Sequence, residues 1–125
     1  MRKHTARIST VVAALAVVVV LTAVVSVAQP KGATVTIKGE AVDLWCYMEG
    51  GDRGPAKKEC ATACANAGNS IGIVDASGTV YLASGLQDHQ PARDILLAKM
   101  NEPVEVTGIL VKKGGAQMLF VKSVK

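Results

Sequence analysis

An almost unbroken apolar leader decides how much of this chain can fold as a domain. Nineteen of residues 1–28 are apolar, and the run Val11–Val25 contains no charged residue. Basic residues precede the run and the small residues Ser26-Val27-Ala28 follow it; the basic residues are Arg2, Lys3 and Arg7. A basic segment, an apolar segment and small residues at the cleavage site describe a secretory signal peptide. We therefore expect cleavage after Ala28.

An uncleaved membrane anchor is the alternative interpretation of the same segment, because about 20 apolar residues suffice to cross a bilayer. Both interpretations keep the basic end in the cytoplasm, so residues 30–125 are expected outside the cytoplasmic membrane, either periplasmic or secreted, or anchored and facing outward. The cytoplasmic membrane is a partner only if the leader stays attached. The predicted organisation is a leader (1–28), a linker (29–33) and one domain (34–125).

The charge of the domain argues against a nucleic-acid partner. Residues 29–125 carry eleven basic and ten acidic side chains, so the sequence pI of about 9.1 comes mostly from the leader. Nucleic-acid binders need a basic surface, and barrels that bind single strands add aromatic stacking platforms. This segment has one Trp, two Tyr and one Phe. We expect no nucleic-acid binding.

The order of predicted elements indicates a mainly β fold. Apolar and β-branched runs predict five strands, and Pro and Gly punctuation predicts two short helices. The expected strands are Thr34–Cys46, Ile71–Asp75, Thr79–Ala83, Val104–Lys112 and Gln117–Val124, and the expected helices are Ala56–Ala67 and Pro91–Met100. Without the first helix, this is the order of a five-stranded OB-like barrel, in which a helix lies between strands three and four. Gly39 and Gly108 inside strands suit the strong coiling of such a barrel. A small α+β sandwich is the alternative.

The sequence resembles a group of small exported bacterial proteins with an OB-like domain and no assigned function. The resemblance is carried by the strand Gly39–Tyr47, which contains Gly-x-x-Val-Asp-x-x-Cys, and by the Cys-x3-Cys helix. The strand residues Val106-Thr107-Gly108 match as well. The resemblance implies the barrel fold and export, and it gives no catalytic residue that could be assigned to this chain.

Three cysteines carry whatever chemistry the sequence contains. Cys60 and Cys64 are four residues apart on a predicted helix, so both thiols share one face. Cys46 is expected at the end of the first strand, where the Gly-rich loop lets the helix fold back. Small residues around the cysteine face are expected to allow close contact with the barrel; these are Ala56, Ala63 and Ala67. We therefore expect Cys46 to lie close to Cys60 or Cys64.

Three uses of these thiols stay open from the sequence. One is a disulfide from Cys46 to Cys60 or Cys64 with one thiol left over, as an oxidising compartment favours. Another is a thiolate site for a transition metal or cofactor, with His89 as the candidate fourth ligand. A surface position just before the second predicted helix is the favoured interpretation of His89. Met48, Glu49 and Asp52 are further possible ligands, although loop surface is the favoured interpretation of each. The third is a set of buried cysteines or a redox-active thiol.

The sequence favours a binding or structural module over an enzyme. No nucleophile, base and orienting group occur at a workable spacing. Glu40 and Asp43 are three residues apart on a predicted strand and point to opposite faces, which argues against an acid–base pair. Trp45 and Tyr47 flank Cys46 and suit either a recognition patch or the edge of the core.

Overall fold

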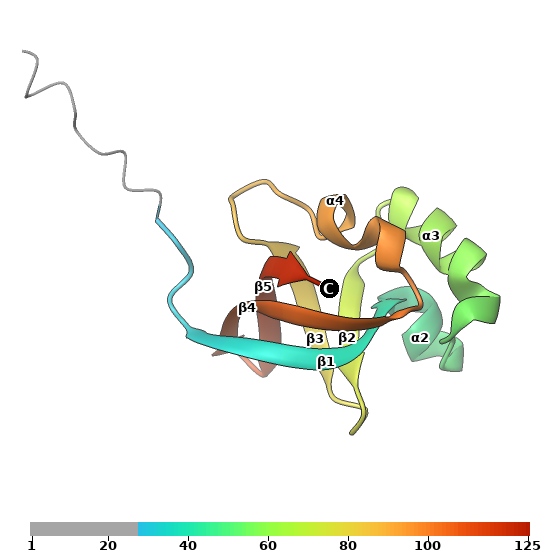
Figure 1. Cartoon of the computed structure of the whole chain (residues 1–125), viewed down its shortest axis with the longest axis horizontal. Coiled ribbons are helices and arrows are strands. Elements are labelled where there is room, and N and C mark those ends of the chain that lie inside the picture. The colour runs from blue at the N-terminus through green and yellow to red at the C-terminus, as the bar shows by residue number, and fades with distance from the viewer. Residues whose placement is uncertain (1–27) are drawn as a thin grey trace, which may run out of the picture.

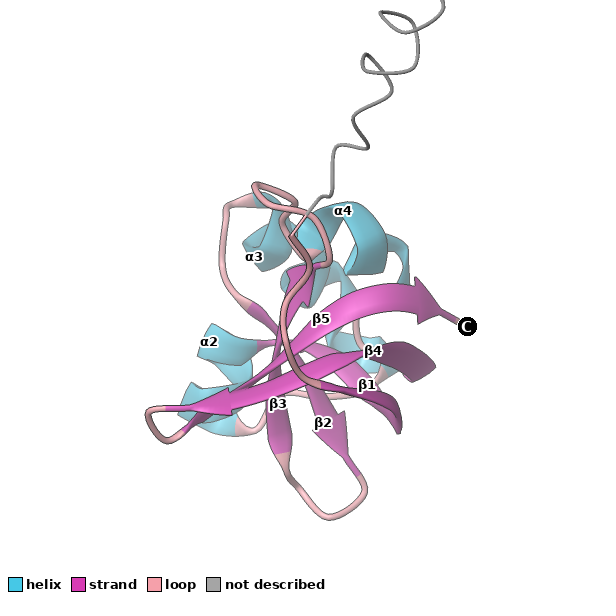
Figure 2. Ribbon diagram, turned by 90° about the vertical axis from the view of Figure 1, so that its left-hand side faces the viewer, coloured by secondary structure: helices cyan, strands magenta, loops and turns pink. Residues whose placement is uncertain are grey.

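Five strands close into a barrel in the order β1-β2-β3-β5-β4 (Figures 1 and 2). This is a computed structural model, and it describes residues 28–125. The strands are β1 (Ala33–Asp43), β2 (Ile71–Asp75), β3 (Val80–Gly85), β4 (Pro103–Lys113) and β5 (Ala116–Val124). All pairings are antiparallel except β3 with β5, which run parallel and close the barrel. The mainly β, five-stranded OB-like barrel is confirmed.

Gly39 is the point at which β1 passes from one neighbour to the other. It is paired with Val104 of β4 and with Asp75 of β2. A Cβ atom at this position would lie 2.4 Å from the carbonyl oxygen of Val74, so only glycine permits the approach. The interior glycine therefore marks the bend in the strand, as the sequence predicts.

Gly108 is the corresponding interior glycine of β4, and it too lies against a neighbouring backbone carbonyl. The register between β4 and β5 shifts between Thr107 and Gly108, and a Cβ at Gly108 would lie 2.3 Å from the carbonyl oxygen of Phe120. The hairpin that follows turns at Gly114 and Gly115, whose φ angles are 60° and 80°. Two successive positive φ angles are what a tight type I′ turn requires, so the predicted hairpin is confirmed.

Short helices occupy two of the connections between strands. Between β1 and β2 lie α2 (Leu44–Gly50), a 3-10 turn (Pro55–Lys57) and α3 (Lys58–Asn66); between β3 and β4 lie α4 (Arg93–Leu96) and a 3-10 turn (Leu97–Lys99). The described residues thus hold three α-helices where the sequence predicts two. The additional one is α2, which takes the predicted strand residues Leu44–Cys46.

The α4 segment covers one end of the barrel and supplies part of the core. Leu96 and Met100 are fully buried among strand residues that are also inaccessible; these include Ile73, Val106, Leu119 and Val121. Ala92, Leu96 and Met100 keep the helical spacing that the sequence indicates, although the helix tightens into a 3-10 turn after Leu96. Burial of these side chains in the core therefore holds the segment on the barrel, although its α-helix is short.

The predicted signal peptide or anchor falls on residues 1–28, and residues 1–27 are outside the described part of the chain. Within residues 28–125, no helix has the length and apolar character needed to cross a bilayer.

Candidate functional site

Cys46 lies in the first turn of α2, and Asp43 holds this turn in place. The Asp43 carboxylate accepts a hydrogen bond from the backbone N–H of Cys46 at 2.8 Å, as an N-cap residue does. Gly51 ends the helix with φ 75°, and its N–H donates to the carbonyl of Tyr47 at 2.8 Å. The prediction that Cys46 ends the first strand is wrong, because the cap at Asp43 turns the chain into a helix.

Cys60 and Cys64 lie four residues apart on α3, next to the face that packs on the barrel. Ala61 and Ala65 are the buried residues of this helix. Ala56, Ala63 and Ala67 are exposed, so the prediction that they form the contact with the barrel is wrong. The reason is helical geometry: each buried alanine follows a cysteine by one residue, about 100° around the axis. The cysteines thus face α2 while the alanines face the barrel.

Hydrogen bonds and an ion pair hold the loop between α2 and α3 against the barrel. Glu40 of β1 accepts from the backbone N–H of Gly54 and from Arg53 Nε, the latter at 3.2 Å. Asn101 Nδ2 donates to the carbonyl of Gly54 at 3.2 Å. Lys58, at the start of α3, pairs with the Glu102 carboxylate. These contacts hold the loop and the start of α3 against β1 and the segment that precedes β4, and α3 lies beside α2 in Figure 1.

The three sulfur atoms converge between α2 and α3. The Sγ atoms of Cys46, Cys60 and Cys64 all lie within 4.8 Å of one another, and those of Cys46 and Cys64 are 3.9 Å apart. All three are free cysteines; Cys60 is exposed and the other two are half-buried. The sequence prediction that Cys46 lies close to Cys60 or Cys64 is confirmed. A tetrahedral site with metal–sulfur bonds of about 2.3 Å has sulfur–sulfur edges of about 3.8 Å, close to the observed spacing.

The surroundings favour the protonated thiols while no cation is bound. The adjacent Asp43 carboxylate, burial and the neighbouring Cys64 together raise the pKa of Cys46 to about 12. Burial is the largest cause of the raised pKa of Cys64. A nucleophilic or redox-active cysteine needs the opposite, a lowered pKa that supplies thiolate near neutrality. A metal ion, in contrast, displaces the thiol protons when it binds.

A small polar cavity borders the cluster on the barrel side. Cys46, Cys60 and Ala61 line it together with four polar residues, which are Asp43, Asp52, Lys57 and Asn101. Asp43 and Asn101 are each 1% exposed, and each has one side-chain oxygen, Oδ1, with no hydrogen-bond partner among residues 28–125. Lys57 Nζ is paired with Asp52 at 3.1 Å, and this carboxylate raises the pKa of Lys57.

The other predicted ligands lie elsewhere. His89 belongs to the loop between β3 and α4, its side chain is 93% exposed and contacts Asp88, and the three-cysteine cluster does not include it. Met48 is 72% exposed and Glu49 is exposed on α2. Trp45 is 65% exposed on the same helix. Of the candidate residues beyond the cysteines, only Asp52 lines the cavity at the cluster.

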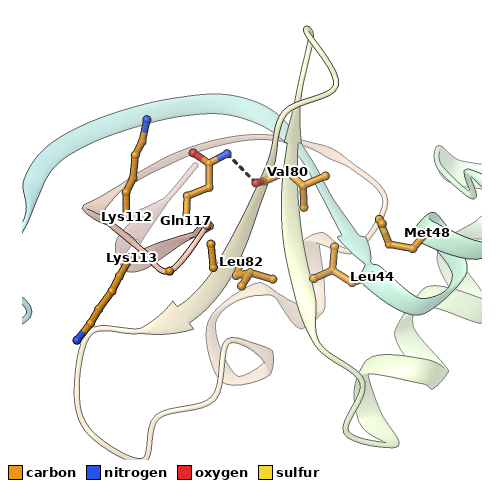
Figure 3. A pocket seen from close by; sticks show the side chains of 10 residues that line it. Leu44, Met48, Val80, Leu82, Lys112, Lys113 and Gln117 are labelled. Atoms are coloured by element: carbon orange, nitrogen blue, oxygen red, sulfur yellow. Dashed lines mark hydrogen bonds between the residues drawn. The ribbon is translucent and has the colours of Figure 1, made fainter.

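A larger, open groove lies on the other face of α2 (Figure 3). Leu44 and Met48 of α2 form one side and the β4–β5 hairpin with Lys112 and Lys113 forms the other. Gln117 Nε2 donates to the carbonyl of Val80 at 3.0 Å and joins the hairpin to β3. The groove contains no group of metal-ligating or nucleophilic side chains, so the candidate chemistry lies with the cysteines.

Sequence reasoning missed Asp43, Lys57 and Asn101 at this site. Asp43 stands directly before the apolar segment Leu44–Met48, a position typical of an N-cap, and this signal could have located both the helix and the carboxylate. Asn101 has φ 55°, a left-handed conformation that asparagine tolerates better than most residues. Its place between a helix and Pro103 is the only sequence hint of that role.

Comparisons with known protein families, curated proteins and solved structures produced no match to this chain. The resemblance to small exported bacterial proteins therefore stays a prediction.

Proposed function

We propose that this chain is a small metal-binding module that holds one transition-metal ion between α2 and α3 through Cys46, Cys60 and Cys64. The observation that carries the proposal is the convergence of all three sulfurs within 4.8 Å. Thiolates are soft ligands that select ions such as Zn²⁺ and Cu⁺. The sulfurs of Cys46 and Cys64 already lie at nearly the edge length of a tetrahedral site, and Cys60 Sγ lies within 4.8 Å of both, so binding needs only a small approach of the third sulfur.

A metal explains the third cysteine, which a disulfide does not. A disulfide between Cys46 and Cys64, the pair at 3.9 Å, uses two of the three thiols. Cys60 would then stand beside the bond without a role, although its Sγ converges on the same point. A metal site uses all three sulfurs and explains why they share one location.

A thiol redox role is the second candidate, supported by the 3.9 Å separation of Cys46 and Cys64. Oxidation of this pair to a disulfide would release two electrons and two protons. The raised pKa of Cys46, about 12, argues against it because the attacking thiolate is scarce at neutral pH. Free-thiol counting separates the candidates: the metal module keeps three thiols under mild oxidation when loaded, and the redox protein loses two.

The direct test is a titration of the reduced protein with Cd²⁺, followed through the ultraviolet thiolate-to-metal charge-transfer band. We expect saturation at one equivalent, with release of protons from the thiols. Cys46→Ser, Cys60→Ser and Cys64→Ser should each weaken binding strongly. His89→Ala is the matched control, because this exposed residue lies outside the cluster and its loss should leave the titration unchanged. Binding that survives in all three serine variants would refute the proposal.

We further propose that the module acts in the cell envelope or outside the cell. The support is the basic and apolar leader in residues 1–28. A protein in this location meets metal ions before they enter the cytoplasm, so a thiolate site suits capture or storage.

A further inference from the structure

The groove between α2 and the β4–β5 hairpin has an apolar floor that the domain leaves uncovered (Figure 3). Leu44 and Met48 come from α2, and Val80 and Leu82 come from β3. Met48 is 72% exposed, and Trp45 on the same helix is 65% exposed; these two are the large apolar side chains that residues 28–125 expose. Apolar side chains that gather at a hollow of the surface are typical of a binding site.

The opposite wall of this groove is positively charged. Lys112 and Lys113 are exposed on the hairpin, and no Asp or Glu of residues 28–125 lines the groove. Neither lysine takes part in an ion pair within that part of the chain. Gln117 Nε2 donates to the carbonyl of Val80 at 3.0 Å, which joins the charged wall to the floor. An occupant therefore needs both apolar groups and negative charge.

The two lysines spread positive charge over both sides of the hairpin. Successive residues of a strand project to opposite faces, and Figure 3 shows Lys112 and Lys113 extending in opposite directions. A fatty acid has one charged end and meets one ammonium group, whereas a peptide with several acidic residues meets both. Nucleic acids also carry distributed charge, but their bases stack on aromatic side chains, and none from residues 28–125 lines this groove.

The spacing of the floor suits an extended peptide. Val80 and Leu82 are two residues apart on β3, so their side chains share a face and lie about 7 Å apart along the strand. Alternate side chains of an extended peptide repeat at the same distance. Leu44 packs beside Leu82 because Gly72, the β2 partner of Leu82, has no side chain; a Cβ at Gly72 would lie 2.5 Å from Leu44 Cδ2. The floor thus offers several apolar contacts in a row.

We propose that this groove binds an extended peptide segment of a partner protein in which apolar and acidic residues alternate. The apolar side chains of the segment cover the floor, and its carboxylates pair with Lys112 and Lys113. The groove is separate from the metal site, because Cys46 follows Leu44 by two residues, about 200° around the axis of α2. The inference therefore goes beyond the metal-binding function and does not depend on it.

Trp45 provides the readout, because it is the only Trp of the chain and belongs to the helix that borders the groove. The probe is a pool of synthetic seven-residue peptides with Glu or Asp at odd positions and Leu, Val or Ile at even positions. One control pool has Lys at the odd positions, and the other has Ser at the even positions. We expect a saturable change in Trp45 fluorescence with the acidic and apolar pool, a much weaker response to either control pool, and weaker binding in added NaCl.

Lys112→Glu/Lys113→Glu is the test variant. Two attractive pairs become two repulsive ones, so we expect about tenfold weaker binding of the acidic and apolar pool. Lys122→Glu/Lys125→Glu is the matched control, because it makes the same change in net charge at two exposed lysines outside the groove, and it should bind nearly as the wild type does. Met48→Ser tests the floor; the side chain is largely exposed, so this variant should fold normally and bind the pool more weakly.

Equal binding of the acidic and basic pools, or equal losses in the two lysine double variants, would overturn the proposal. A tighter response to dodecanoate or to phosphatidylglycerol vesicles would overturn it as well, because the occupant would then be an acyl chain or a membrane. Self-association that Lys112→Glu/Lys113→Glu abolishes would assign the groove to a second copy of this chain instead. Trp45 fluorescence that no peptide pool changes would also refute it. None of these results alters the Cd²⁺ titration of the cysteines, so the two proposals fail separately.

Discussion

The packing of α3 on the barrel should control metal affinity, and Ala65→Leu tests this connection. Ala65 is 1% exposed and faces the barrel, one residue after Cys64. A leucine adds three carbons to a side chain that is buried between α3 and the barrel, so we expect α3 to move outward to accommodate it. Because Cys60 and Cys64 both belong to α3, the outward movement carries two of the three sulfurs away from Cys46.

The expected magnitude follows from overpacking. Extra methylenes in a filled core cost about 1–3 kcal/mol, and outward movement of the helix relieves part of this strain. An ion that draws the sulfurs together moves α3 back toward the barrel, so binding brings back the packing strain of Leu at position 65 and is weakened by it. A coupling of about 1–3 kcal/mol corresponds to a loss of about 5–150-fold in affinity. The three Sγ atoms lie within 4.8 Å of one another and must approach to about 3.8 Å around an ion, so outward movement of α3 adds to the distance that binding has to close.

The assay is denaturant unfolding of the metal-free protein together with Zn²⁺ competition titration. Ala63→Leu is the matched control, because Ala63 is exposed on the same helix and the same leucine should change neither quantity by much. Ala65→Leu protein that loses stability but binds Zn²⁺ as tightly as the wild type would show that α3 does not position the ligands. Equal effects of the two variants would refute the reasoning as well.

Other expected results concern the core, the thiols and the leader. Leu96→Ala should cost about 2–5 kcal/mol in the free energy of unfolding, because the fully buried side chain leaves a cavity that thermal or denaturant melting detects. Folding raises the pKa of the Cys46 thiol, so this thiol stabilises the metal-free folded state fully below pH 9.0 and loses its contribution as the pH rises toward about 12. Cys46→Ser should remove this part of the dependence of the unfolding free energy on pH. A reporter fused after Lys125 should be active only outside the cytoplasm, and cytoplasmic activity would contradict export. Zn²⁺ affinity should fall at acid pH, where protons compete for the thiolates.

Strand pattern and glycine placement were enough to predict the barrel. Gly39 lies where β1 bends, and Gly108 lies where the β4–β5 register shifts. Both positions leave no room for a Cβ atom, and a glycine inside a strand pattern signals such a position in the sequence. The segment Leu44–Met48 was harder, because Leu, Trp, Cys, Tyr and Met suit a strand as well as a helix. A single hydrogen bond, from Cys46 N–H to Asp43, helps to decide in favour of the helix.

The site was predictable only in part. The i, i+4 spacing of Cys60 and Cys64 placed both thiols on one face, and the short glycine loop implied the return to Cys46. The polar cavity was not visible, because Asp43, Lys57 and Asn101 are far apart in the sequence and meet only through the packing of the barrel. His89 is the only histidine of residues 29–125, but this does not indicate whether its side chain lies near the cysteines.

The most direct test of the cysteine site is X-ray absorption at the zinc edge on protein loaded with one equivalent of Zn²⁺. Three sulfur scatterers at about 2.3 Å and one light scatterer at about 2.0–2.2 Å are the predicted result. A first shell with no more than one sulfur, or with only nitrogen and oxygen, would contradict the claim that Cys46, Cys60 and Cys64 bind the ion together.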